Sequence, residues 1–324
     1  MTGVGGNVGL SIVQTIRDID PGAWVLGCDA RDRHAGSIVS DEFIQAPKAE
    51  SAVYETWLDT VCREHHISHI IPATDHELLR IHASAALGRM PSRIITPNRL
   101  AVKVSRDKYA LSHFLKERGI VVPWAKLPAE ASALDVPFIL KPRRGSGGRG
   151  VRTIATFEDF KSIDILDETF FIQELLRPAN REVTCGVFRT KCGETRVIQL
   201  LRTLAEGRTM LAQIISDPEI QELCEQVAAA LELRGSVNVQ LIATAEGPRI
   251  FEINGRFSST VHLRSRLGYQ DVLWSLDDAD GRTPSAYSPA PPGTVVYWTP
   301  SVSVLRPWEL SHSRIAISEG GPTL

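Results

Sequence analysis

Hydrophobic positions in the first hundred residues follow two kinds of spacing. Apolar residues recur at helical spacing between residues 10 and 19 and again between 53 and 65, which predicts two helices. Short apolar runs at 23–27 and 69–72 predict buried strands. Strands that alternate with helices are typical of an α/β domain.

The pattern changes after Pro97-Asn98, a pair typical of a domain boundary. A helix is expected just beyond it, with Ser105 or Asp107 as the N-cap. An apolar stripe over 220–231 predicts a further amphipathic helix. The strands predicted in this part of the chain lie at 137–142, 169–174, 182–188, 236–242, 249–254 and 295–298.

The composition is that of an ordinary globular chain. Of its 324 residues, 43% are hydrophobic and 23% charged, which suits about two domains with real cores. The formal net charge is -2, so no large basic field for nucleic acid is expected. The five cysteines lack CxxC spacing, and no apolar run reaches the length of a membrane span. We expect a soluble, cytoplasmic protein without nucleic-acid or membrane partners.

A dense glycine loop follows the strand predicted at 137–142. Residues 144–150 read Arg-Gly-Ser-Gly-Gly-Arg-Gly, and such a backbone can turn several N–H groups toward one anion. Lys141 stands just before the loop, where its ammonium can reach the same anion. The loop lacks the ending of a Walker P-loop, so by itself it indicates either a phosphate site or a flexible surface hairpin.

Oxygen-bearing side chains share one face of the hairpin predicted around Glu246. Asn238 and Gln240 lie two residues apart on the first strand, as do Glu252 and Asn254 on the second. A turn centred on Glu246 pairs Asn238 with Asn254 and Gln240 with Glu252. Mg²⁺ takes such oxygens together with substrate phosphates. The alternative is a solvated polar sheet face.

Alternation along the second strand divides its other side chains between two faces. Ile250 is expected on the face of Glu252, whereas Phe251 and Ile253 are expected in the core. The hydroxyl-rich run 258–260 follows soon after, which favours a functional site over a solvated face.

Taken in this order, the features resemble the ATP-grasp superfamily, in particular the large subunit of carbamoyl phosphate synthase and biotin carboxylase. The resemblance covers about residues 1–275 and is most specific from 106 to 256. It implies a single ATP-grasp unit of mixed α/β (α+β) class. The implied parts are an N-terminal Rossmann-like pre-ATP-grasp domain over 1–104, an ATP-grasp domain over 105–283 with a glycine-loop subdomain at about 120–180, and a C-terminal strand and tail over 284–324.

The resemblance also implies roles for individual residues. Glu252 and Asn254 would hold the metals that bridge the ATP phosphates, with Gln240 beside them. Arg256 would face the acyl phosphate and act in catalysis together with Lys141. The implied ATP-binding residues are Lys108 and Lys141 at the phosphates, Gly145, Ser146, Gly147 and Gly148 in the glycine loop, Gln173, Glu174, Leu175 and Leu176 at the adenine, and Glu182 at the ribose.

The implied activity is that of a ligase that uses ATP and Mg²⁺ (or Mn²⁺) to join a small carboxylate to an amine. Gly255 replaces the proline of carbamoyl phosphate synthases, and Ser259 replaces their second arginine. The chain has one ATP-grasp unit and no glutamine-hydrolysing portion, so carbamoyl phosphate synthesis is not expected. No lysine stands in a biotin-carrier context, so biotin carboxylation is not expected either. The sequence identifies neither the acid nor the amine, and a homodimer is compatible with it.

Substrate contacts are expected beside the metal hairpin. Arg202 lies on a strand that heads toward the cleft in the family layout, and His262 and Arg264 come just after the hairpin. The segment 75–77 follows a strand and is expected at the edge of the cleft between domains. The dense histidines at 65–69 indicate a solvated helix end rather than a catalytic group.

The N-terminal glycine turn supports a second interpretation. Residues 3–9 are rich in glycine and Asp29 follows about twenty positions later, as in the dinucleotide-binding turn of an NAD(P)-dependent oxidoreductase. Such a turn also occurs as a structural joint, and little chain precedes it to form the first strand. A third interpretation is an ATP-grasp binding module without activity, against which the retained Lys108, Lys141, Glu252 and Asn254 argue.

Overall fold

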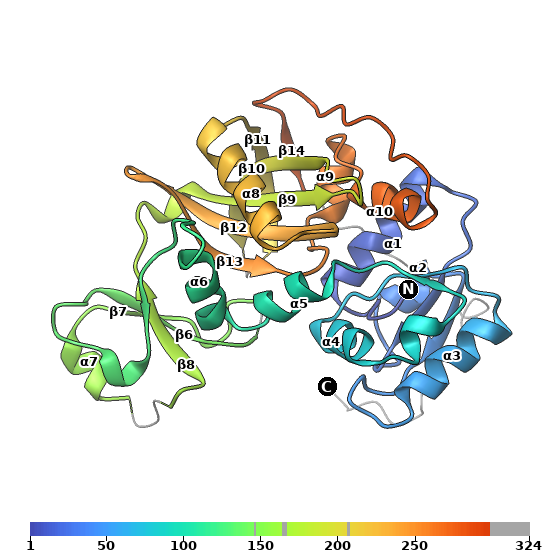
Figure 1. Cartoon of the computed structure of the whole chain (residues 1–324), viewed down its shortest axis with the longest axis horizontal. Coiled ribbons are helices and arrows are strands. Elements are labelled where there is room, and N and C mark those ends of the chain that lie inside the picture. The colour runs from blue at the N-terminus through green and yellow to red at the C-terminus, as the bar shows by residue number, and fades with distance from the viewer. Residues whose placement is uncertain (146, 164–166, 206–207, 299–324) are drawn as a thin grey trace, which may run out of the picture.

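The computed structural model of the chain describes residues 1–145, 147–163, 167–205 and 208–298. Figure 1 shows an N-terminal α/β body, a large sheet above and beside it, and a small sheet at the far end of the large one. Helices α5 (Arg99–Ser105) and α6 (Lys108–Lys116) run between the N-terminal body and the small sheet. This mixed architecture confirms the predicted fold class.

The N-terminal body is built from two parallel strand pairs. Strand β1 (Leu26–Asp29) pairs with β2 (Glu42–Gln45), and β3 (His69–Ile70) pairs with β4 (Arg93–Ile94). The helices predicted at 10–19 and 53–65 are confirmed as α1 and α3. The helices of this body are α1 (Asn7–Ile19), α2 (Gly36–Val39), α3 (Tyr54–Glu64) and α4 (Asp75–Ala83).

Residues 1–4 take the place of the short first strand between β1 and β3. The Cys28 N–H donates to the Met1 carbonyl at 2.8 Å, and Val4 N–H donates to the Cys28 carbonyl at 3.2 Å. On the other side Thr2 N–H donates to the Ile71 carbonyl at 3.2 Å. The chain then turns through its glycines directly into α1.

A six-stranded antiparallel sheet forms the centre of the molecule, in the order β13-β12-β9-β10-β11-β14. Its long strands β10 and β11 are not identified by the hydrophobic pattern, apart from the expectation that Arg202 lies on a strand. The strands are β9 (Glu182–Arg189), β10 (Thr195–Ala205), β11 (Arg208–Ile215), β12 (Gly235–Thr244), β13 (Gly247–Asn254) and β14 (Val295–Tyr297).

Alternation along the strands gives this sheet two different faces. Val183, Cys185 and Val187 of β9 point into an apolar core beneath α8 (Pro218–Ala230). The other face is covered at one end by α9 (Val261–Arg266) and α10 (Asp271–Ala279), where Phe188 packs near Trp274. At its other end that face carries polar side chains.

The small sheet is antiparallel, in the order β5-β8-β6-β7, and lies within the range expected for the glycine-loop subdomain. Of the two N-caps predicted, Asp107 caps α6 and accepts from the N–H groups of Tyr109 and Ala110 at 3.1 Å, whereas Ser105 ends α5. The elements here are α5 (Arg99–Ser105), α6 (Lys108–Lys116), β5 (Ala125–Lys126), β6 (Phe138–Pro142), β7 (Arg152–Ile154), α7 (Phe157–Lys161) and β8 (Phe170–Glu174).

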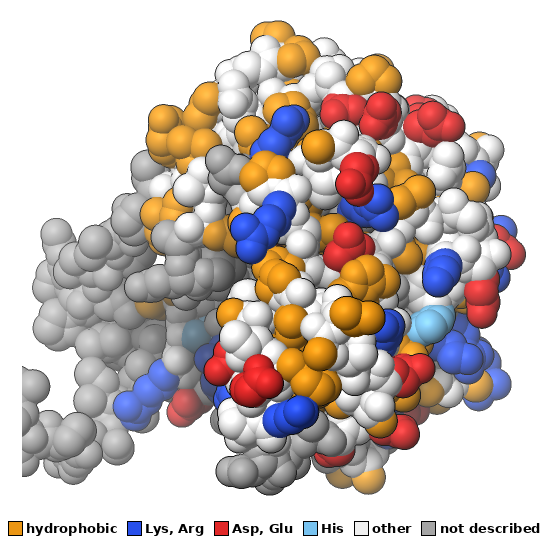
Figure 2. Space-filling view, turned by 90° about the vertical axis from the view of Figure 1, so that its left-hand side faces the viewer, with side chains coloured by type: hydrophobic (Ala, Val, Ile, Leu, Met, Phe, Trp, Pro, Cys, Tyr) orange, Lys and Arg blue, Asp and Glu red, His pale blue; other side chains and the backbone are white. Residues whose placement is uncertain are grey.

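The surface reflects the near-neutral charge of the chain. On the face seen in Figure 2, the basic and acidic side chains of the described residues are interspersed among apolar ones. No helix among the described residues is long and apolar enough to cross a membrane. The predicted C-terminal strand is confirmed as β14, whereas the tail from residue 299 lies outside the described residues.

The glycine turn allows a close approach between α1 and the first strand. A Cβ on Gly9 would lie 2.3 Å from the Gly3 carbonyl oxygen and 2.7 Å from Val4 Cα. We therefore expect Gly9→Ala to lower the free energy of unfolding by about 1–3 kcal/mol through overpacking. Denaturant titration measures this change. Gly88→Ala is the control, since its Cβ meets nothing within 4 Å, and an equal loss in both variants would contradict the packing role.

Candidate functional site

The hairpin β12–β13 has the cross-strand pairs that the sequence predicts. Asn238 lies opposite Asn254 and Gln240 lies opposite Glu252. The turn is tighter than expected, because Thr244 already pairs with Gly247. A bulge between Gln240 and Leu241 restores the predicted pairs.

The bulge corrects the expected faces of β13. Leu241 lies opposite Ile250 and Gln240 opposite Glu252, so Phe251 is the extra residue. Ile250 and Ile253 are both buried in the core under α8, so placing Ile250 on the face of Glu252 was wrong. Phe251 is only half-buried, which contradicts its predicted burial in the core.

Lys141 joins the small sheet to this bulge. Its Nζ donates to the Phe251 carbonyl at 3.2 Å, and the ammonium lies 5.3 Å from the centroid of the Phe171 ring and 5.4 Å from that of Phe251. Burial lowers the pKa of Lys141 to about 8, while the charge of Glu252 opposes this shift and that of Lys108 adds to it. The site therefore holds a lysine whose charge is costly without an anion.

Lys108 approaches the same carboxylate from the start of α6. Its Nζ lies 3.8 Å from Glu252 Oε1 and donates to the Gly145 carbonyl at 2.6 Å. Gly145, Gly147 and Gly148 have positive φ, and a Cβ on any of them would meet nothing within 4 Å. The glycine loop thus starts within reach of both lysines. Ser146 lies outside the described residues.

Arg202 connects Glu182, the residue expected at the ribose, to the hairpin β12–β13. It forms an ion pair with Glu182, and its Nη2 donates to Gln240 Oε1 at 3.0 Å. Next to them, Thr184 Oγ1 donates to Asn238 Oδ1 at 3.0 Å. The Arg202 Nε and the Asn238 Nδ2 are buried without a hydrogen-bond partner in the described part of the chain. Two such donors favour an anionic or carbonyl ligand here.

Arg256 reaches the N-terminal body. Its Nε donates to Asp75 Oδ1 at 2.8 Å, its Nη1 to the Phe257 carbonyl at 3.1 Å and its Nη2 to Asn254 Oδ1 at 3.4 Å. Among the described residues these contacts use three of the five N–H donors, which leaves one on each terminal nitrogen. Asp75, from the segment 75–77 expected at the edge of the cleft, thus contacts the residue that follows the hairpin.

The segment expected at the adenine lies where the chain leaves the small sheet for the large one. Gln173 is buried on β8, and Leu175 and Leu176 follow half-buried. Glu174 forms two hydrogen bonds with Trp124. The Glu174 N–H donates to the Trp124 carbonyl at 3.0 Å, and Glu174 Oε2 accepts from the Trp124 N–H at 3.2 Å. These contacts continue the pairing of β8 with β5 and hold the end of β8 against this edge strand of the small sheet.

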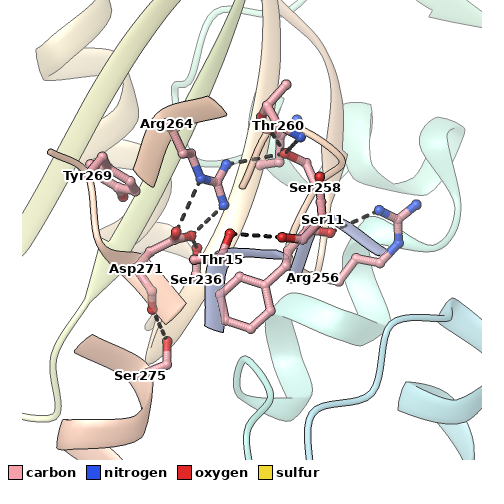
Figure 3. Close-up of polar contacts among 12 residues, drawn as sticks. Ser11, Thr15, Ser236, Arg256, Ser258, Thr260, Arg264, Tyr269, Asp271 and Ser275 are labelled. Atoms are coloured by element: carbon pink, nitrogen blue, oxygen red, sulfur yellow. Dashed lines mark hydrogen bonds and ion pairs between the residues drawn. The ribbon is translucent and has the colours of Figure 1, made fainter. Parts of the chain in front are cut away.

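Two of the residues expected at the substrate have other partners. Arg264 is fully buried in an ion pair with Asp271 (Figure 3), so it has no surface to offer a substrate and that prediction is corrected. His262 Nε2 lies 2.8 Å from Asp18 Oδ2 on α1, away from the hairpin. Of the three, only Arg202 lies in the polar cluster that it forms with Glu182, Gln240, Thr184 and Asn238.

In the N-terminal turn, the carboxylate of Asp29 accepts hydrogen bonds from nearby backbone N–H groups. Asp29 Oδ2 accepts from the Gly5 N–H at 2.8 Å, and Asp29 Oδ1 accepts from the Arg31 N–H at 3.0 Å. The carboxylate that would bind the ribose of NAD is therefore engaged with the turn. This geometry favours a structural joint over a dinucleotide site.

The donor set on the hairpin fits a divalent cation shared with a ligand. Within the described residues no three His, Cys, Asp or Glu side chains group as metal ligands. Glu252 supplies one carboxylate, and Gln240 and Asn254 supply amide oxygens. Mg²⁺ is commonly bound by one or two carboxylates with the remaining positions filled by phosphates and water, so this sparse set suits a nucleotide-bound metal.

Comparison with known proteins assigns the class of the central domain. Residues 105–260 match the ATP-grasp domain family, and the chain carries an ATP-grasp domain. The predicted resemblance is confirmed.

Similar proteins extend this assignment. Residue identity is 27% over 180 residues with a D-alanine–D-alanine ligase of Corynebacterium efficiens, covering 45% of this chain and 48% of that protein. It is 27% over 161 residues with a 3-methyl-D-ornithine–L-lysine ligase of Methanosarcina acetivorans, covering 49% and 41%. The chain thus spans about half the length of these curated relatives.

A solved structure shows the same fold over most of the chain. The biotin carboxylase of Campylobacter jejuni superposes with a TM-score of 0.67 at 15% identity, covering 87% of this chain and 70% of that one. The superposed share of the chain is larger than residues 105–260, so the likeness of fold extends beyond the central domain.

Proposed function

We propose that the chain is an ATP- and Mg²⁺-dependent ligase that activates a carboxylate as an acyl phosphate and joins it to an amine. One observation carries the proposal: Lys108 and Lys141 converge on Glu252, in a hairpin that pairs Gln240 with Glu252 and Asn238 with Asn254. Cations beside a carboxylate and amide oxygens form a site for phosphates and a metal.

Different residues of the site would contact the metal, the phosphates and the nucleoside of ATP. We infer that Glu252, Asn254 and Gln240 hold Mg²⁺ (or Mn²⁺), which when bound neutralises charge on the phosphates. Lys108 and Lys141 neutralise the same phosphates from the side of the glycine loop. The adenine and ribose would then lie along residues 173–176 and at Glu182, the latter after rearrangement of its ion pair with Arg202.

The reaction proceeds by two displacements. A carboxylate oxygen of the acid attacks the γ-phosphorus of ATP, the bond to the β,γ-bridging oxygen breaks and ADP leaves. The amine nitrogen then attacks the acyl carbon, loses a proton and displaces inorganic phosphate. The two N–H groups that remain on Arg256 suit the acyl phosphate oxygens, because a planar guanidinium binds two oxygens in parallel.

Amino acids are the substrates to test first. Two relatives are named as ligases of amino acids, and an amino acid can serve as either the acid or the amine. We further propose that the functional parts follow the limits 1–104, 105–283 and 284–324, with the substrates entering between the first two. The contact of Asp75 with Arg256 across these parts supports this arrangement.

The function is tested by ADP release from Mg-ATP in the presence of pooled amino acids, beside a calorimetric titration with NAD. We expect ADP release that depends on Mg²⁺ and on the added acid. Tight binding of NAD without binding of Mg-ATP would overturn the proposal in favour of an oxidoreductase. Binding of Mg-ATP without ADP release from any acid and amine would indicate a binding module.

We expect Glu252→Gln to remove turnover while the fold remains. The amide is nearly isosteric, but the metal loses its carboxylate, and a loss of about 3–4 kcal/mol of transition-state stabilisation slows the reaction by roughly two to three decades. ADP release under saturating ATP measures this. Glu246→Gln is the matched control, since Glu246 lies exposed in the turn of the same hairpin. Turnover of the Glu252 variant within about threefold of the parent would refute the metal assignment.

Lys141 makes nucleotide affinity depend on pH. The free chain loses the Lys141 proton above a pKa of about 8, whereas bound phosphates favour the charged form. Binding above pH 8 must therefore take up a proton, and the affinity for Mg-ATP should fall by roughly tenfold between pH 7 and pH 9.5. Calorimetry measures this dependence. Lys141→Arg should flatten it, because arginine keeps its charge; the same slope in both proteins would contradict a phosphate contact.

A further inference from the structure

Resting on the proposed function, we infer that the buried Arg264–Asp271 pair, through Ser258, is the positioning device for Arg256. The pair lies on the sheet face that carries the polar cluster, at the end covered by α9 and α10 (Figure 3). It acts on Arg256 through the loop that joins β13 to α9, without touching the substrate itself.

The pair is held on several sides and is closed to solvent. Arg264 is 0% exposed and Asp271 1% exposed. The Arg264 Nε donates to Asp271 Oδ1 at 3.2 Å, and the Arg264 Nη2 forms a second contact with Asp271 Oδ2. A Cβ on Gly186 of β9 would lie 3.1 Å from Arg264 Nη1, so the guanidinium lies directly against the sheet.

One arm of the network reaches the metal hairpin. Ser236 Oγ donates to Asp271 Oδ2 at 2.5 Å. Ser236, Asn238 and Gln240 follow each other on one face of β12 because side chains alternate along a strand. Asp271 therefore fixes the residue that precedes Asn238 on the functional face.

The other arm reaches the loop that carries Arg256. Arg264 Nη1 donates to Ser258 Oγ at 3.2 Å, and Ser258 Oγ also lies 2.6 Å from Thr260 Oγ1. The Arg256 Nη1 donates to the carbonyl of Phe257, and that carbonyl belongs to the peptide unit that ends at Ser258. Holding Ser258 thus sets the position of an acceptor that orients the Arg256 guanidinium.

The energetics of burial support a role in geometry. Burying two charges costs hydration free energy, and their mutual attraction offsets only part of that cost. Well-packed apolar residues in place of an ion pair often give a core the same stability or more. A buried pair with directional contacts to a strand and to a loop fixes how these two elements sit relative to each other. Here the strand carries the proposed metal ligands and the loop carries Arg256.

Ser258→Ala tests the link without leaving an unpaired buried charge, which Arg264→Ala or Asp271→Ala would do. Ser275→Ala is the matched control, because Ser275 is equally buried and its Oγ donates to the Asp271 carbonyl at 2.6 Å, on the side away from the loop. We expect kcat for ADP release to fall about tenfold in Ser258→Ala, with KM for ATP within about twofold of the parent. Ser275→Ala should keep both constants within about twofold.

Hydrogen exchange supplies a readout that does not depend on activity. Amides of residues 255–260 should exchange at least about fivefold faster in Ser258→Ala and within about twofold of the parent in Ser275→Ala. Unchanged exchange in Ser258→Ala, or an equal loss of kcat in both variants, overturns the inference. If the parent releases no ADP with any acid, the proposed function fails, and the exchange comparison still decides whether the pair holds the loop.

Discussion

The bulge in β13 is the constraint on which the site depends. Without the bulge, the regular register that starts at the tight turn after Thr244 would place Gln240 opposite Phe251 instead of Glu252. A shift of one residue exchanges the two faces of a strand, so the carboxylate would enter the apolar core under α8. The bulge lets Ile250 and Ile253 both pack in that core while Glu252 lies between them on the functional face.

The same bulge joins two sheets. The Phe251 carbonyl accepts from the Lys141 ammonium, and the rings of Phe251 and Phe171 lie beside that ammonium. A local irregularity in the large sheet therefore provides the anchor for the last residues of β6 in the small sheet. The glycine loop starts from that anchor, and Lys108, which lies near Glu252 and donates to the Gly145 carbonyl, adds a second connection between the loop and the hairpin.

Much of this arrangement follows from the sequence, because alternation and family spacing are local signals. The cross-strand pairs of Asn238 and Gln240 required only a count along two strands. The bulge was missed, since a uniform register satisfies the same count, and the apolar Ile250 and Phe251 give no local sign of which one enters the core. Arg264 was misplaced for a different reason: its partner Asp271 follows it on another helix, and nothing in the pattern distinguishes a buried arginine from an exposed one.

The resting contacts of the cations indicate how the site can accept a charged ligand. Lys108 and Lys141 donate mainly to the neutral carbonyls of Gly145 and Phe251, and Glu252 is the carboxylate near both. A neutral acceptor orients an ammonium without cancelling its charge, and the one carboxylate of Glu252 offsets only part of the charge of two lysines. Phosphate oxygens therefore meet a net positive field in a partly buried site. Arg256 differs, because Asp75 compensates it from the N-terminal body. The phosphate side of the site is thus charged in advance, whereas the arginine proposed for the later acyl step depends on how the N-terminal body is placed.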